Sequence, residues 1–420
     1  MNNILVYDTQ KKGVRILSIL FLLVLAAIII PSEIVCRVCS LSLFIGCVLL
    51  GRKEQRFVNP YYLFSLTPLS LTIYTDIGGR YMLELSHDTW VLALINIYAF
   101  IFALFSTPSF KNIKNCIGVS RTAGLIIGAF LMYGIYLASL LVPELNALFW
   151  FTSIAAMVFA LRSKKTVGLI FCAFLFLSSV FSGHSSKMGM LLYVLTFLIC
   201  YDKFYSVTRK QRLRVIALSA IGAVFMIFAF SFANKERGEY NAVDGQAYYE
   251  QQGSFEWNYN SSLLMPYLYF STPWTNVEYV VQTQNERTNG LWLIKPVLGY
   301  VGLDEKFSKE YELVPYSSFN TFTFICCGFK DFGYWLSILS ALFLGFFVKK
   351  VYSRFVISKS PFDVTSYILV ALATAEMFFS NHFFMQSYPF TAFLMMEVYK
   401  YITYFFGNNR TLDIELSTNR

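Results

Sequence analysis

Charged residues are scarce in this sequence, because Asp, Glu, Lys and Arg together make up only 14% of its 420 residues. Soluble proteins of ordinary composition carry about 25%. Hydrophobic residues reach 56%, and apolar runs long enough to cross a bilayer recur along the whole chain. This composition excludes an ordinary soluble enzyme and predicts a protein with many membrane spans.

Motifs for nucleotides and metals are also missing. No GxxxxGK[ST] pattern occurs, so nothing predicts a nucleotide site. The single CxxC, Cys36 to Cys39, has neither a second cysteine pair nor a nearby histidine, which a zinc site would need. Most of the eight cysteines lie within apolar runs, where a thiol behaves as a small hydrophobic group. We expect no metal, no cofactor and no disulfide framework.

The apolar runs are continuous rather than alternating, which favours helices, since backbone groups in lipid must be paired within their own segment. Twelve spans are predicted, at residues 14–30, 34–50, 58–75, 89–107, 122–142, 145–161, 166–182, 188–201, 215–233, 334–349, 363–380 and 387–406. The third is the weakest, because Pro60 and Pro68 interrupt it. The first is too long for the core of a cleavable signal peptide, so we expect it to remain as a helix.

Basic residues divide unequally between the two sets of connections. One set holds 23 Lys and Arg, whereas the opposing short connections hold three, Arg37, Arg80 and Lys187. The positive-inside rule therefore places both termini in the cytoplasm. The net charge of +9 follows from this topology and does not indicate nucleic-acid binding.

One long connection, residues 234–332, lies on the non-cytoplasmic side. It contains twelve acidic and seven basic residues, and it is too rich in Trp, Tyr and Phe to be a solvated tether. Residues 262–274 and 290–303 are aromatic and broken by Pro or Gly, which predicts short interfacial helices. The predicted organisation is membrane helices over 1–233, a large periplasmic loop over 234–332, membrane helices over 333–406 and a cytoplasmic tail over 407–420.

Ionisable residues near membrane spans are the first candidates for function. Those on the non-cytoplasmic side include Arg80, His87, His184, Lys187, Lys235, Arg237, Arg287, Lys330, Asp331 and His382. The simpler interpretation is that such cations anchor helix ends and that the histidines are ordinary polar residues. Lys187 stands out, because it opens an apolar run against the positive-inside rule.

Several cations among aromatic residues, without nucleotide or metal motifs, suit a ligand that combines phosphate with sugar. Arg binds phosphate oxygens through two parallel hydrogen bonds, and cations stabilise a departing diphosphate. A carboxylate or a histidine can accept the proton of an attacking hydroxyl. A sugar linked to a lipid diphosphate makes all of these demands.

Residues 317–347, SSFNTFTFICCGFKDFGYWLSILSALFLGFF, resemble a signature of the oligosaccharide repeat-unit polymerases, the O-antigen polymerase (Wzy) group. That signature is an Asn followed by aromatic and small residues, then Asp-aromatic-Gly before a span. The matching positions are Asn320, Asp331, Phe332 and Gly333. The turn FSGHSSKMGMLLYVL is similar to the group's Gly-Ser-Arg-Gly turn, with Lys187 where Arg is usual.

The resemblance implies an all-α polytopic, GT-C-like glycosyltransferase at the periplasmic face of a bacterial inner membrane. It would join undecaprenyl-diphosphate-linked repeat units by metal-independent transfer with inversion, with a chain-length regulator as partner. Substrate contacts would fall to Arg80, Lys187, Arg237, Arg287 and Asn320, and activation of the acceptor hydroxyl to Asp331, His184 or His382.

Three alternatives stay open. Residues 314–333 could be an aromatic interfacial anchor, with Asp331 favoured by the helix dipole. An O-antigen ligase would be expected to place a histidine in its large loop, and residues 234–332 contain none. A lipid-linked oligosaccharide flippase needs charges inside its spans, and Glu376 and Glu397 are the main ones here.

Overall fold

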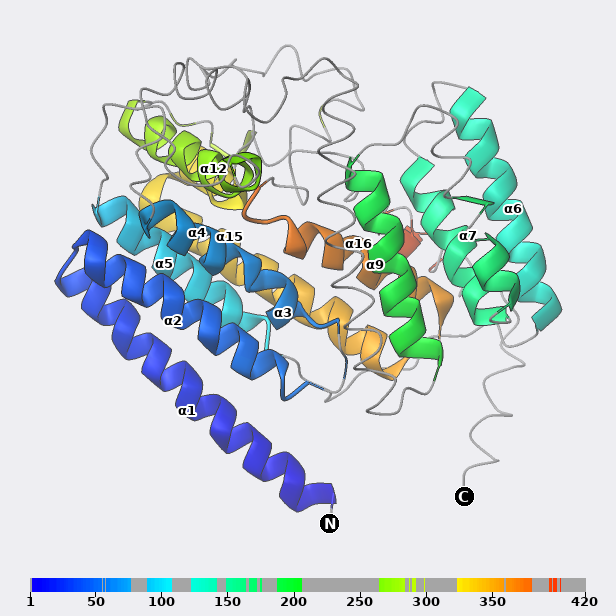
Figure 1. Cartoon of the computed structure of the whole chain (residues 1–420), viewed down its shortest axis with the longest axis horizontal. Coiled ribbons are helices and arrows are strands. Elements are labelled where there is room, and N and C mark those ends of the chain that lie inside the picture. Colours follow the sequence, from blue (N-terminus) through cyan, green and yellow to red (C-terminus); the bar gives the residue numbers. More distant parts are fainter. Residues whose placement is uncertain are drawn as a thin grey trace.

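The computed structural model in Figure 1 shows the helices as coloured ribbons. The residues it describes are 2–54, 56, 58–76, 89–107, 122–141, 149–163, 166–171, 174–175, 187–205, 264–283, 287, 289–291, 298, 323–358, 360–379, 393–394, 396–398 and 401. Every regular element among these residues is a helix, which confirms the all-α prediction for this part of the chain.

Eleven helices define the arrangement of the described residues. They are α1 (Asn2–Ile29), α2 (Glu33–Gly51), α3 (Pro60–Phe64), α4 (Leu66–Asp76), α5 (Thr89–Phe105), α6 (Thr122–Leu141), α7 (Phe149–Ser163), α9 (Lys187–Phe204), α12 (Leu264–Thr283), α15 (Phe324–Ile357) and α16 (Pro361–Ala375).

The helices pack as two neighbouring groups (Figure 1). Helices α1, α2 and α5 lie side by side and contact α4 and α15, while α6, α7 and α9 pack together beyond α16. Helix α12 lies over α4 and the start of α15. Helices α5 and α15 approach closely at Gly345, where an added Cβ would come within 2.9 Å of the Phe102 carbonyl oxygen.

By length and apolar composition, one described helix, α2, is able to cross a membrane. Five shorter apolar segments fall below that length, at Gly13–Ile29, Thr89–Phe105, Leu125–Leu141, Phe149–Ser163 and Pro361–Ala375. The twelve-span topology goes further than this finding and stays a prediction.

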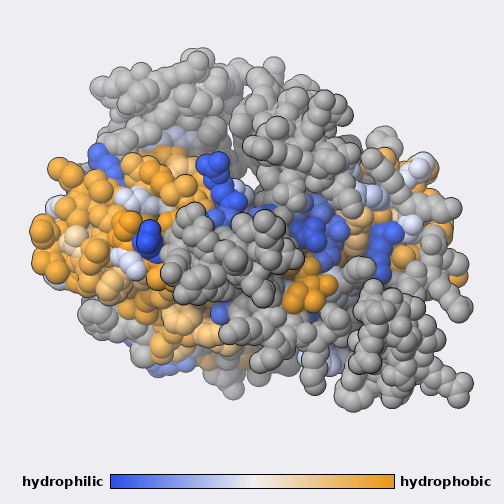
Figure 2. All heavy atoms as spheres, turned by 90° about the horizontal axis from the view of Figure 1, so that it is seen from below, coloured by the Kyte–Doolittle hydropathy of each residue, from blue (hydrophilic) through white to orange (hydrophobic). Residues whose placement is uncertain are grey.

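The polarity of the described helices is reversed relative to a soluble bundle. Helix α2 exposes the apolar stripe Ile34, Val38, Leu41, Ile45 and Leu49, which recurs at the three- and four-residue spacing of one helix face. Its opposite face buries Ser40, whose hydroxyl lies 3.0 Å from Oδ1 of the buried Asn96 on α5. Figure 2 shows hydrophobic residues gathered over the flank where Figure 1 places α1, α2 and α5.

Contacts between helix ends fall into two sets. What we call the inner end is made of residues 52–54, 56, 58–59, 202–205, 352–358 and 360–363. Here Nη1 of Arg56 donates to the Asp202 carbonyl oxygen at 2.7 Å. The outer end is made of residues 36–37, 74–75, 278, 287, 289–290 and 329–334. Here Arg37 donates to the Thr75 carbonyl oxygen. Each of these contacts joins segments that the charge pattern assigns to the same side of a membrane.

Three segments differ in detail from the sequence expectation. The third run forms two helices, α3 and α4, because Pro68 has no N–H to bond the Phe64 carbonyl and cannot continue α3. Helix α12 runs for 20 residues through Pro273, where the sequence predicts a short, proline-broken helix. Helix α15 begins at Phe324, ten residues before the predicted span.

Five cysteines are buried free thiols: Cys36, Cys39, Cys47, Cys200 and Cys326. Their burial in the apolar core fits the role of small hydrophobic groups predicted from the sequence.

Candidate functional site

Helix α15 is broken at Gly333, within the Asp-Phe-Gly sequence that carries the family resemblance. Gly333 has φ 72° and ψ −169°, a backbone conformation that is essentially restricted to glycine. The break separates residues 324–332 from the long segment that follows it. The sequence places a glycine where the chain must change direction, at the boundary predicted between loop and span.

Arg287 lies against this break, although it is 46 residues earlier in the sequence. Its Nη1 donates to the Phe329 carbonyl oxygen at 2.9 Å, and its guanidinium carbon is 5.9 Å from the centre of the Tyr334 ring. A Cβ added to Gly333 would lie 3.3 Å from Arg287 Nε, so only glycine leaves the guanidinium its full space. Arg287 is exposed, and its cation therefore remains accessible to a ligand.

The turn at Asn289 and Gly290 also contacts the α15 break, through its backbone. Asn289 and Gly290 both have positive φ, at 50° and 89°, which suits Asn and Gly. The Asn289 N–H donates to the Asp331 carbonyl oxygen at 3.1 Å, and Gly290 lies beside the Phe332 ring. The structure thus brings together two of the predicted site residues, Arg287 and Asp331.

Lys330 and Asp331 are buried in this arrangement, at 2% and 1% exposure. They lie in the helical turn before Gly333, whereas Phe332 between them and the break is 38% exposed. Asp331 is therefore inaccessible to a substrate hydroxyl in the described conformation. Its burial favours a role in holding the break over direct proton transfer.

A second polar group joins α12 to α4 beside the break. Trp274 Nε1 donates to Ser70 Oγ at 2.7 Å, and the Tyr74 hydroxyl donates to Oε2 of Glu278. In the sequence, Glu278 stands out only as part of the loop's net charge. The four-residue spacing of 70 and 74, and of 274 and 278, shows only that each pair shares one helix face, so the sequence carries no clear signal for the contact between the two helices.

The other predicted residues are placed as follows. Lys187 is the first residue of α9, as expected for a residue that opens an apolar helix. Arg80, His184, Arg237, Asn320 and His382 lie outside the described residues.

No family model, curated protein or solved structure matches this chain.

The arrangement at the outer end joins one accessible cation to an aromatic surface. Arg287 presents its guanidinium beside Tyr334 and near the exposed Phe332. A guanidinium binds phosphate or carboxylate oxygens bidentately, and aromatic rings pack against the apolar faces of sugars. The site is thus suited to an anionic ligand that carries a ring.

Proposed function

We propose that this chain is a polysaccharide repeat-unit polymerase of a bacterial inner membrane. It transfers a growing chain from one undecaprenyl-diphosphate carrier onto the next lipid-linked unit at the periplasmic face. The transfer uses no metal. The proposed topology has twelve spans, the large loop 234–332 outside the cytoplasm and both termini inside.

One observation carries this proposal: the loop cation Arg287 lies on the Gly333 break. The resemblance links the Asp-Phe-Gly sequence to the polymerase group, and Arg287 is a candidate for an independent reason, as a cation of the large loop. Their contact, through the 2.9 Å bond to the Phe329 carbonyl oxygen, supports a shared site. Arg287 then stabilises the diphosphate that departs from the donor sugar.

The reversed polarity of the helices supports a membrane setting. Apolar side chains are exposed at regular intervals on α2, α6 and α15, for example at Leu339, Phe343 and Phe346. Lipid would cover such faces, whereas water would make them aggregation-prone. The separation of inner-end and outer-end contacts also agrees with the proposed alternation of spans.

Within this proposal, the remaining residues have complementary roles. Arg80, Lys187 and Arg237 add positive charge for the diphosphate and sugar, and Asn320 contacts sugar. Because Asp331 is buried, we assign it to positioning the break and assign activation of the acceptor hydroxyl to His184 or His382.

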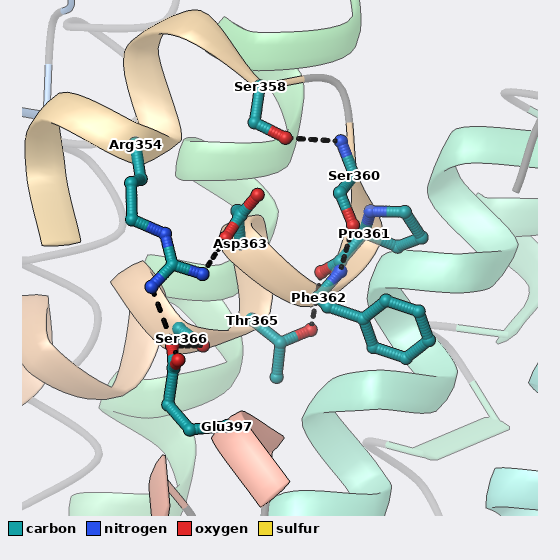
Figure 3. A network of polar contacts seen from close by, with 9 residues as sticks. All are labelled: Arg354, Ser358, Ser360, Pro361, Phe362, Asp363, Thr365, Ser366 and Glu397. Carbon is teal, nitrogen blue, oxygen red and sulfur yellow. Dashed lines mark hydrogen bonds and ion pairs between the residues drawn. The ribbon is translucent and has the colours of Figure 1, made fainter. Parts of the chain in front are cut away.

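The two glutamates that would suit a transporter lie at a helix end and in an ion pair. Glu376 follows the last residue of α16 as its C-cap, with its N–H bonded to the Leu372 carbonyl oxygen. Glu397 accepts a hydrogen bond from Arg354 at 3.2 Å (Figure 3). Among the described residues, these two positions do not line a charged path through the spans, which favours polymerase over flippase.

The proposal is tested by complementing a strain that lacks this chain. Wild type should restore the ladder of surface-polysaccharide chain lengths seen on a gel. Arg287→Ala should leave the lipid A-core capped with single repeat units. Loss of one charge-assisted contact to a departing group predicts about a 100-fold slower reaction. Arg287→Lys retains the charge without the planar fork and should give an intermediate ladder.

Arg52→Ala is the matched control, since Arg52 is an exposed arginine at the inner end. It should restore a full ladder at equal membrane abundance. A full ladder from Arg287→Ala would remove Arg287 from the site. A deletion strain without even the single capped unit would point to export or ligation instead.

A further inference from the structure

Helix α12 is joined to α4 by two hydrogen-bonded pairs that lie one turn apart. Trp274 Nε1 donates to Ser70 Oγ at 2.7 Å, and that hydroxyl donates in turn to the Phe270 carbonyl oxygen at 2.6 Å. One turn further along both helices, the Tyr74 hydroxyl donates to Glu278. The two pairs form a seam on matching faces of the helices.

This seam is buried. Ser70 and Trp274 are fully buried, Tyr74 is 2% exposed and Glu278 is 5% exposed. A buried polar group that loses its hydrogen-bond partner destabilises the packing around it. A shift of α12 along α4 by one turn would break both pairs at once, so the seam specifies a single register.

The position of α12 restricts the position of Arg287. Helix α12 ends at Thr283, four residues before Arg287. Four residues span at most about 14 Å when fully extended. On the far side, Arg287 and Asn289 bond the carbonyl oxygens of Phe329 and Asp331 at the α15 break. Helix α12 also contacts α15 directly.

We infer that α12 is a positioning arm, in which the Tyr74–Glu278 and Ser70–Trp274 pairs hold Arg287 at the Gly333 break. Tyr74 and Glu278 are therefore positioning residues for the site, an assignment that rests on the proposed function only where it concerns catalysis. Neither residue contacts the substrate. Each acts by fixing where the guanidinium lies.

The packing of α12 on α4 can be measured in the purified full chain by the reactivity of a cysteine introduced on α12. Ser271 on α12 is fully buried, and Ser271→Cys places a thiol there with little change in size. Its labelling rate by a maleimide, measured by mass spectrometry on its own peptide, reports how often α12 leaves α4. Tyr74→Phe should raise this rate about tenfold, equivalent to 1.4 kcal/mol of docking free energy.

The position of the turn after Arg287 relative to the α15 break can be measured by the yield of a cross-link between them. Asn289→Cys and Phe332→Cys place thiols on the exposed turn and on the exposed residue beside the break. A short bis-maleimide should join them in otherwise native protein, and Tyr74→Phe should lower the yield. Glu278→Gln retains an oxygen acceptor for the Tyr74 hydroxyl and should keep both the yield and the polysaccharide ladder near wild type.

Tyr98→Phe is the matched control, because it removes a tyrosine hydroxyl that bonds Ser340 between α5 and α15. It should leave both thiol readouts unchanged. Three results would overturn the inference: labelling and cross-linking unaffected by Tyr74→Phe, faster labelling with an unchanged cross-link, or an equal effect of Tyr98→Phe. Loss of the ladder in Glu278→Gln with an intact cross-link would make Glu278 a reacting group and overturn its assignment.

The two proposals fail separately. If Arg287→Ala keeps a full ladder but Tyr74→Phe still loosens the cross-link, the arm stands and the polymerase site does not. If Arg287→Ala loses the ladder and the thiol readouts ignore Tyr74, Arg287 acts without the arm, and the inference is wrong.

Discussion

An arginine lies near each end of α15, and the two differ in what they bind: Arg354 belongs to the last turn of the helix, whereas Arg287 packs against the break near its start. At the inner end, Arg354 has a side chain only 16% exposed and bonds two carboxylates, Asp363 at 2.8 Å and Glu397 at 3.2 Å. At the outer end, Arg287 is exposed and bonds a backbone carbonyl. Arg354 is neutralised within the protein, whereas Arg287 keeps its charge available to a ligand.

The rest of the inner end follows the pattern of Arg354. Figure 3 shows Arg354 linking the end of α15 to the start of α16, where Ser360 caps the helix through the Phe362 N–H at 3.3 Å. Lys203 of α9 donates to the carbonyl oxygens of Phe355 and Val356 at the end of α15. These contacts tie three helices together and leave the inner end suited to stability rather than ligand binding.

The largest effect on stability should come from Arg354→Met. Removing the cation leaves Asp363, 1% exposed, and Glu397 close together without it. Breaking a buried ion pair on one side costs about 3–5 kcal/mol. Thermal unfolding in detergent should show a large drop in midpoint. Lys350→Met changes an exposed residue on the same helix and should leave the midpoint nearly unchanged. An equal drop in the midpoint of both variants would show that the ion pairs of Arg354 do not stabilise the fold.

Gly333→Ala should have the next largest effect and should act on the outer end. A non-glycine residue at φ 72° and ψ −169° costs about 1–3 kcal/mol, and its Cβ would also crowd Arg287 Nε at 3.3 Å. We expect lower stability together with loss of the polysaccharide ladder. The control is Gly134→Ala, within α6, where an added Cβ meets nothing within 4 Å and should stabilise the helix slightly. A full ladder from Gly333→Ala would show that the break is not part of the site.

Glu54 should make the inner end sensitive to pH. It lies in the turn after α2, where burial raises its pKa from 4.5 to about 6, and a hydrogen bond from the Tyr352 hydroxyl opposes this shift in part. The folded state then holds this proton more tightly than the unfolded state does. The stabilisation from Glu54 is present below pH 4.5 and is lost as pH rises through 6, about 2 kcal/mol in all.

The measurement is the unfolding midpoint of wild type and of Glu54→Gln between pH 4 and pH 7. Wild type should lose stability relative to the variant over this range, since the amide does not titrate. Parallel curves for the two proteins would mean that Glu54 is hydrated in the folded state. Other carboxylates titrate equally in both proteins and cancel in the difference.

The sequence predicts the helices better than it predicts their contacts. Long apolar runs correspond to α2, α5 and α15, because span length and continuous hydropathy are local properties. The sequence predicts a change from loop to span at Gly333, whereas the helix begins at Phe324 and is broken at Gly333. The pairing of Tyr74 with Glu278 depends on two segments 204 residues apart, and a charge count could not reveal it.

The smallest effect on stability should come from Arg287→Ala, the same variant that should lose the ladder. An exposed arginine with one bond to a backbone carbonyl contributes about 0.5 kcal/mol or less, so its midpoint should stay close to wild type and far above that of Arg354→Met. Activity and stability would then separate cleanly between the two ends of α15. If Arg287→Ala has as low an unfolding midpoint as Arg354→Met, the guanidinium stabilises the fold at the Gly333 break. Loss of the ladder would then follow from misfolding, and the outer end would no longer differ in kind from the inner end.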